Sequence, residues 1–169
     1  KGLNWANKIM PWVRKVKISY GVDCQRFRPN LEPLKLNLTR PIILSVAGPE
    51  KFKRIDLTIK AVSQLPKATL VIAGDQAKNI INLGNKLLGK ERFKILKLTN
   101  RKMPALYNTA DLFTLASDSR EAFGVSYLEA MACNLPVVAS DDNLRRELIG
   151  NAGILTNRVN TDHYAKALN

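Results

Sequence analysis

Residues 121–140 read EAFGVSYLEAMACNLPVVAS, a helical pattern followed directly by a short apolar strand. Glu121 and Glu129 enclose seven residues, which places one carboxylate before the helix and the other on its body. Carboxylates accept strong hydrogen bonds from hydroxyl groups, and glycine at 124 lets backbone approach a bound molecule closely. The stretch therefore predicts an α/β unit with two acidic ligand-binding residues. Because Glu129 lies among apolar residues, a structural ion pair is its alternative role.

Apolar strands and helical patterns alternate through most of the chain. We expect strands at residues 16–19, 41–47, 69–73, 93–98, 112–116, 136–139 and 153–155. We expect helices at residues 55–65, 77–88, 104–110, 124–133, 144–148 and 162–168, and a surface loop at 30–40. Continuous apolar strands separated by helices are typical of a parallel sheet covered on both faces. The sequence therefore predicts a Rossmann-like, doubly wound α/β domain with a mainly parallel sheet.

The 169 residues are enough for one domain with a substantial hydrophobic core. We assign the whole chain, 1–169, to that domain, with residues 1–16 as an N-terminal linker or helical segment. Trp5 and Trp12 stand there among basic residues, which favours an amphipathic helix that ends or kinks at Pro11. We expect the tryptophans to pack against the sheet, and contact with a membrane surface is the alternative.

The chain is strongly basic, with 27 Lys and Arg residues against 14 Asp and Glu and a formal net charge of +13. This excess favours an anionic partner, such as nucleotide phosphates or an anionic membrane surface, although a merely solvated basic surface is equally compatible. Nucleic acid is disfavoured as a partner, because few aromatic residues interleave with the basic ones.

Cysteine and histidine are scarce, which limits the chemistry that the chain offers. Cys24 and Cys133 form no metal-binding pattern and no strong disulfide pattern, and the apolar surroundings of Cys133 predict a buried thiol. A reducing, cytoplasmic setting is the default for such a chain. The single histidine, His163, lies in a polar segment, and no Gly-x-Ser-x-Gly occurs, so a Ser–His–Asp triad is disfavoured. No Asp-x-Asp occurs either, and we expect no metal and no other cofactor.

Ligands of doubly wound sheets bind outside the carboxyl ends of the strands. The loops expected there are 48–54, 74–76, 99–103, 117–124 and 140–143. The first of these loops holds Lys53 and Arg54 near a helix N-terminus, where cations and free backbone N–H groups attract phosphate. A solvated basic loop is the alternative. For Gly74, at the end of a strand, a turn is the first interpretation and a ligand contact the second.

Five blocks in order resemble the large family of retaining glycosyltransferases called group 1 or family 4, in the C-terminal, donor-binding domain of the GT-B fold. The blocks are 20–23 with 27–29, 43–59, 70–75, 106–111 and 121–140. The resemblance implies binding of a nucleotide-diphosphate sugar. It also implies an N-terminal acceptor-binding domain and transfer of the sugar, with retained configuration, to a lipid, polysaccharide or other glycan. We expect the 169 residues to bind the donor without transferring sugar on their own.

The resemblance also implies roles for individual residues. Lys53 would bind the donor diphosphate, Glu121 would lie beside the transferred sugar, and Glu129 would accept hydrogen bonds from ribose hydroxyls. Lys53 and Glu121 are the implied catalytic residues. The remaining residues expected around the donor are Gly48, Arg54, Gly74, Leu98, Thr99, and the backbone of Phe123, Gly124 and Val125.

Several positions depart from the family pattern. Gly48 stands where the family has an arginine that helps to hold the diphosphate, and Lys51 and Arg54 are the candidates to replace it. Ala122 replaces a glycine, and Tyr20 replaces an asparagine. These departures leave a second hypothesis, a non-catalytic binding or interaction module whose donor site has decayed.

Overall fold

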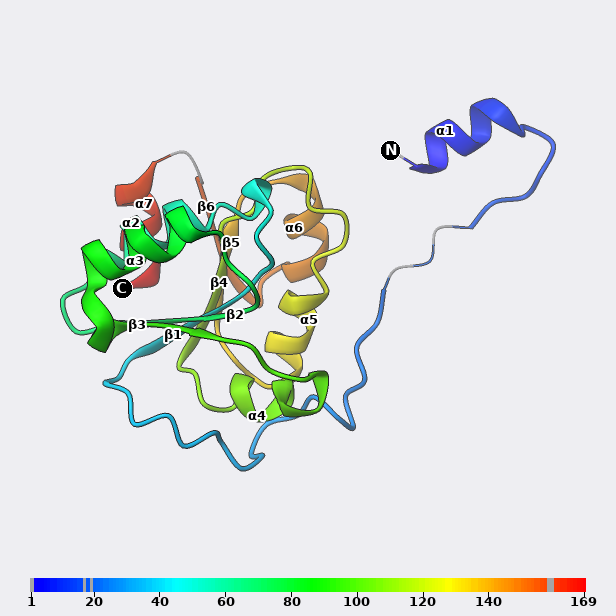
Figure 1. The fold of residues 1–169 in the computed structure, drawn as a ribbon. Coiled ribbons are helices and arrows are strands. Elements are labelled where there is room, and N and C mark those ends of the chain that lie inside the picture. Colours follow the sequence, from blue (N-terminus) through cyan, green and yellow to red (C-terminus); the bar gives the residue numbers. More distant parts are fainter. Residues whose placement is uncertain (1, 17, 19, 158–159) are drawn as a thin grey trace.

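The computed structural model describes residues 2–16, 18, 20–157 and 160–169. Its centre is a six-stranded sheet in the order β3-β2-β1-β4-β5-β6, in which every pair of neighbouring strands is parallel (Figure 1). The strands are β1 (Ile42–Val46), β2 (Thr69–Ala73), β3 (Phe93–Leu96), β4 (Leu112–Leu115), β5 (Val137–Ser140) and β6 (Gly153–Thr156). The predicted Rossmann-like α/β fold is confirmed.

Helices cover both faces of the sheet (Figure 1). One face carries α2 (Ile55–Ser63), α3 (Lys78–Arg92) and α7 (Thr161–Leu168), with α2 packed against both of the others. The opposite face carries α4 (Met103–Tyr107), α5 (Val125–Ala132) and α6 (Asn143–Ile149). Two single-turn 3-10 helices, η1 (Lys51–Lys53) and η2 (Asn100–Lys102), precede α2 and α4.

Coverage on both faces explains why the strands are apolar throughout. All five residues of β2 are buried, as are the first four of β1. Leu44, Leu70 and Ile72 have no exposed surface, so each removes its full apolar area from water. Burial of one such side chain stabilises the fold by about 1.5–3 kcal/mol.

The predicted strand at residues 16–19 is wrong for the residues that the structure describes. Val16 and Ile18 are not in a strand and are 70% and 85% exposed; Lys17 and Ser19 lie outside the described residues. A strand needs a neighbour to pair with its backbone, and this segment runs away from the sheet (Figure 1). The β-branched side chains alone therefore gave a false signal.

The N-terminal segment begins with helix α1 (Gly2–Ile9), which ends before Pro11 as expected. Trp5 and Trp12 are 63% and 79% exposed, so the expected packing of these tryptophans against the sheet is wrong. The helix lies apart from the sheet and its covering helices (Figure 1). Its apolar side chains thus find no core within the described part of this chain.

Residues 23–38 pack and hydrogen-bond against the end of α4 and the two residues that follow it. Phe27 is buried, and its ring meets the Tyr107 ring edge to face at 5.9 Å. The Asn108 side chain donates to the Arg28 carbonyl at 3.0 Å, and Thr109 Oγ1 accepts from the Leu34 amide at 2.8 Å. The predicted loop at 30–40 is confirmed, and several of its leucines pack on the core.

Gly84 sets the distance between α3 and the edge strand β3. A Cβ at this position would lie 2.2 Å from the buried ring of Phe93. We expect Gly84→Ala to lower the free energy of unfolding by about 1–2 kcal/mol, because overpacking outweighs the roughly 1 kcal/mol gained in helix propensity. Chemical denaturation would measure this, with exposed Asn85→Ala on the same helix as control. A more stable Gly84→Ala variant would contradict the close packing.

Candidate functional site

A cavity of about 580 Å³ lies at the carboxyl ends of the strands β1 to β3, beside the start of α5. Lys53, Glu121 and Glu129 all line it. Among the other residues expected around a donor, those that line this cavity are Gly48, Gly74, Leu98, Phe123, Gly124 and Val125. The sequence stretches after β1, β2, β3 and β4 therefore meet in one crevice, which we call the donor cavity after the ligand that the sequence resemblance implies.

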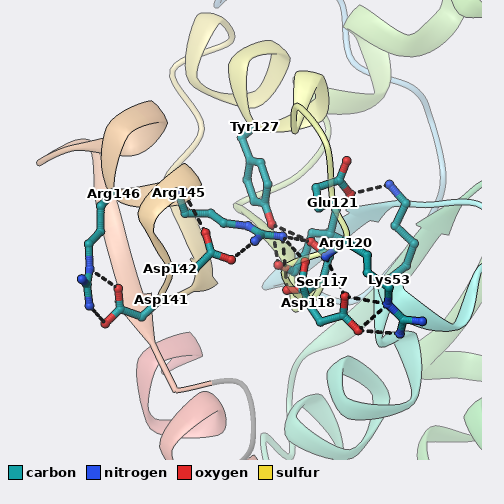
Figure 2. A network of polar contacts seen from close by, with 11 residues as sticks. Lys53, Ser117, Asp118, Arg120, Glu121, Tyr127, Asp141, Asp142, Arg145 and Arg146 are labelled. Carbon is teal, nitrogen blue, oxygen red and sulfur yellow. Dashed lines mark hydrogen bonds and ion pairs between the residues drawn. The ribbon is translucent and has the colours of Figure 1, made fainter. Parts of the chain in front are cut away.

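Lys53 and Glu121 form an ion pair across the donor cavity (Figure 2). Lys53 Nζ lies 2.6 Å from Glu121 Oε2, and the two side chains are only 18% and 10% exposed. The residues are 68 positions apart in sequence, and their loops are joined by a second contact, from the Asp118 amide to the Phe52 carbonyl at 2.8 Å. The ion pair and this backbone bond together hold the two loops in register.

Glu129 projects from the body of α5 and meets a phenol instead of a cation. Tyr107 Oη donates to Glu129 Oε2 at 2.7 Å. The alternative of a structural ion pair is wrong, since no ion pair involves Glu129 within the residues that the structure describes. Burial raises the pKa of Glu129, and the Tyr107 hydrogen bond and the charge of Arg26 act in the opposite direction.

The N-terminus of α5 opens onto the donor cavity. Gly124 precedes the helix in the left-handed region, at φ 70°, and a Cβ there would lie 2.6 Å from the Tyr127 ring. Gly124 has no side chain with which to cap this end of α5, and the first residues of the helix, Val125 and Ser126, line the cavity. The first backbone N–H groups of a helix lack partners within it and attract anions. The exposed ring of Phe123 stands beside them, 4.2 Å from the ring of Tyr20.

The floor of the cavity is made by backbone where β1 and β2 end. Gly74 has φ 129°, and a Cβ there would lie 2.2 Å from the Ala47 carbonyl oxygen, so only glycine fits. The side chain of Gln76 donates to the Ala47 and Gly48 carbonyls at 2.8 and 3.3 Å. The turn interpretation of Gly74 and its place in the site are thus compatible.

Comparison with known proteins supplies the family. Residues 27–169, most of the chain, match the model of the group 1 glycosyl transferases. This chain belongs to that family. It is 29% identical over 140 residues to D-inositol 3-phosphate glycosyltransferase of Mycobacterium leprae, a match that covers 75% of this chain and 32% of the relative. The chain therefore spans about a third of the length of this relative.

Solved structures of glycosyltransferases share the fold. The Anabaena HepE structure in complex with UDP and glucose superposes with a TM-score of 0.78 at 24% identity, over 89% of this chain and 45% of HepE. A glycosyltransferase from Rickettsia africae superposes with a TM-score of 0.73 at 25% identity, over 88% of this chain and 44% of the other. The described fold is thus about half of each larger structure.

Two of the residues expected in this group 1 glycosyl transferase site lie elsewhere. Arg54 lines a second cavity, of about 510 Å³, on the other side of loop 48–54, and so does Lys51. Arg54 is in the left-handed region, at φ 50°, and its guanidinium pairs with Asp56, so the turn that directs Lys53 inward directs Arg54 outward. Lys51 and Arg54 therefore do not line the donor cavity, where the family pattern places an arginine at position 48.

Thr99 is exposed and does not line the donor cavity, although its neighbours Leu98 and Asn100 do. Thr99 is in extended backbone, where successive side chains point to opposite sides. Loop 140–143 is also absent from the cavity wall, because Asp142 caps α6 and Asp141 pairs with Arg146. Thr99 and this loop therefore lie outside the cavity wall.

Sequence reasoning missed Lys97, which lines the donor cavity beside Leu98. The predicted strand at 93–98 included Lys97, whereas β3 ends at Leu96 and releases it toward the cavity. There Lys97 pairs with Asp75, which follows β2. Asp75 and Lys97 could both have been expected at the site from the sequence, because each lies just after the end of a strand.

A buried arginine also went unnoticed. Arg145 on α6 has no exposed surface, and its guanidinium donates to the Ser117 and Asp118 carbonyls at 3.2 and 3.1 Å and pairs with Asp142 (Figure 2). Ser117 Oγ accepts a further hydrogen bond from it. Arg145 thus holds the start of the loop that carries Glu121.

Two further findings concern metals and membranes. Among the described residues, no group of three or more His, Cys, Asp and Glu side chains is placed to hold a metal ion. Within the same part of the chain, no helix has the length and apolar character that crossing a bilayer demands. Cys133 is buried, which confirms the expectation of a buried thiol, and burial raises the pKa of this thiol to about 11.

The Arg145 contacts predict a difference between two adjacent arginines. We expect Arg145→Met to lower the free energy of unfolding by about 2–4 kcal/mol, because it strands Asp142 and the loop carbonyls without their donor. Amide hydrogen exchange at 117–121 should accelerate as well. Arg146→Met is the matched control, since Arg146 is exposed and pairs only at the surface. Equal effects of the two substitutions would contradict the role given to Arg145.

Proposed function

We propose that this domain binds a nucleotide-diphosphate sugar in the donor cavity and that the full-length protein transfers the sugar with retained configuration. One observation carries the proposal: Lys53, Glu121 and Glu129 line a single cavity together with the N-terminus of α5. That cavity offers a cation and backbone donors for phosphate, and carboxylates for hydroxyl groups.

The donor is oriented by these chemical preferences. The diphosphate lies against Lys53 and the first N–H groups of α5, the sugar beside Glu121, and the ribose beside Glu129. The structure of HepE in complex with UDP and glucose supports UDP as the first nucleotide to test. Leu98, Asn100 and Met103 also line the cavity, and we assign the base to them.

Transfer breaks the bond between the anomeric carbon and the diphosphate, so negative charge grows on the leaving group. Lys53 and the α5 N–H groups stabilise that charge, and they do so most in the transition state. Lys53 Nζ lies 2.6 Å from Glu121 Oε2. A bound diphosphate therefore competes with Glu121 for the ammonium group, which leaves the carboxylate free to accept hydrogen bonds from the sugar.

The acceptor is assigned to a part of the protein beyond these residues. The chain covers 32% of its Mycobacterium leprae relative and 45% of HepE. We propose that an N-terminal domain binds the acceptor and contacts the exposed apolar side chains of residues 5–20, among them Trp5, Trp12 and Ile18. The net charge of +13 further supports contact of the protein with an anionic membrane surface, in a cytoplasmic setting.

Lys53→Ala should weaken UDP binding at least tenfold, about 1.4 kcal/mol, because it removes the charge-assisted contact to phosphate and leaves Glu121 without its counterion. Isothermal titration calorimetry would measure the change. Lys51→Ala is the control, since Lys51 is in the same loop but lines the second cavity. The UDP affinity of this variant should stay within about twofold of that of wild type. Equal losses in the two variants would show that only bulk charge attracts the nucleotide.

Glu121→Gln should distinguish the contribution of the diphosphate to binding from that of the sugar. UDP should bind as well as to wild type or a few-fold tighter, because Lys53 no longer shares its charge with a carboxylate. The preference for UDP-glucose over UDP should shrink, because a carboxylate is the stronger acceptor for sugar hydroxyls. Competition calorimetry gives both affinities, and a parallel loss for UDP and UDP-glucose would contradict the placement of the sugar beside Glu121.

A second candidate function is a binding module without catalysis. Gly48 lacks the arginine of the family pattern, and the Glu50 carboxylate occupies the space where its side chain would begin, 2.6 Å from an added Cβ. Although Glu50 lines the second cavity, an anion this close to Gly48 disfavours a diphosphate beside that residue. Absence of binding to UDP, GDP and ADP by the 169-residue chain would favour this module, whereas Lys53-dependent binding favours the donor site.

A further inference from the structure

The Tyr107 hydroxyl is buried and directed at the donor cavity from behind. Tyr107 ends α4 and has no exposed surface. Its Oη lies 2.7 Å from Glu129 Oε2 and 3.4 Å from the Ser126 carbonyl oxygen. Both of these partners belong to residues that line the cavity, whereas Tyr107 does not. Tyr107 therefore acts on the site only through α5.

Neighbouring rings fix the direction of this hydroxyl. The Phe27 ring meets the Tyr107 ring edge to face at 5.9 Å and 74°, and the Phe113 ring lies 5.9 Å away on β4. Phe27 and Phe113 are themselves buried. Because packed aromatic rings cannot swing freely, the hydroxyl stays aimed at one carboxylate oxygen.

The hydrogen bond from Tyr107 uses one of the acceptor positions of the Glu129 carboxylate and leaves the others available. An ionised carboxylate accepts about four hydrogen bonds, two at each oxygen. Tyr107 occupies a place at Oε2, on the α4 side, and Glu129 also lines the donor cavity. The remaining acceptor positions are then presented to the cavity in a fixed orientation, which suits a vicinal diol.

The same contact affects the charge of Glu129. Burial raises its pKa, and the Tyr107 hydrogen bond is the larger of two opposing effects, ahead of the charge of Arg26. Cys133, at the end of α5, is a neutral thiol with a pKa of about 11. Of the other charged groups at the cavity, Lys53 pairs with Glu121 and Lys97 with Asp75.

We propose that Tyr107 is a positioning residue that aims the Glu129 carboxylate at the ribose hydroxyls of the donor. The proposal rests on the proposed function, because it takes the ligand to be a nucleotide. It assigns discrimination of ribose to a residue that does not touch the ligand.

Tyr107→Phe tests the proposal in the 169-residue chain, with UDP and 2′,3′-dideoxy-UDP as probes in calorimetry. Wild type should prefer UDP, and Tyr107→Phe should reduce that preference by about tenfold, the worth of one charge-assisted hydrogen bond. UDP affinity falls as Glu129 is protonated at low pH, and the variant should lose affinity at a higher pH, because Glu129 has lost a donor that favours its ionised form. A merely structural role would move neither the preference nor the pH profile.

Tyr164→Phe is the matched control. Tyr164 is equally buried and bonds Thr114 Oγ1 at 2.8 Å, and it does not line the donor cavity. It should lose similar stability yet keep the wild-type preference and pH profile. Should Tyr107→Phe fold poorly, the single substitution Glu129→Gln provides the test in its place. On its own it should remove the preference for UDP over 2′,3′-dideoxy-UDP.

The outcomes separate two failures. If the unaltered chain binds none of UDP, GDP and ADP, the proposed function falls and this inference with it. If the chain binds UDP, and Tyr107→Phe weakens UDP and its dideoxy form equally at every pH, only the inference falls. It also falls if Glu129→Gln leaves the preference for UDP intact.

Discussion

The pairing of β1 with β4 is the constraint on which the site depends. β1 pairs with β2 along its whole length, Ile42–Val46, but with β4 only through Ile43 and Leu44. The chain winds outward in both directions from this line, and α2 and α5 leave their strands toward opposite faces of the sheet (Figure 1). The loops after β1 and β4 therefore separate, and the crevice between them is where doubly wound folds bind ligands. Here the two loops are joined again by Lys53 and Glu121.

The fold was largely predictable because burial on both faces of a parallel sheet leaves a strong signal. Every predicted strand and helix after residue 40 is present, with shifts at the ends. The strand at 16–19 failed because its apolar alternation says nothing about whether a partner is available. The predicted helix at 77–88 ends where regular helical backbone ends, because Gly89 has a φ of 72°, although α3 resumes and reaches Arg92.

The candidate site was predictable at the level of loops and less so at the level of side chains. Lys53, Glu121 and Glu129 were predicted to share a site from their positions after strands and from the resemblance. The structure places all three in one cavity. Which way a side chain points depends on single dihedral angles, and for that reason Arg54 was misplaced. The supporting residues Tyr107 and Arg145 gave no signal of their own, because a buried polar residue looks in sequence like any other polar residue on a helix. Their partners are set by tertiary packing, which no local pattern encodes.

One short turn, Lys51–Lys53, separates two hollows of similar size. Lys53 lines one hollow and Lys51 lines the other, so this segment contributes to the walls of both. A ligand in either hollow would therefore lie beside the same stretch of backbone. A fluorescent group attached at position 51 would thus lie close to a ligand bound in the donor cavity without occupying that cavity.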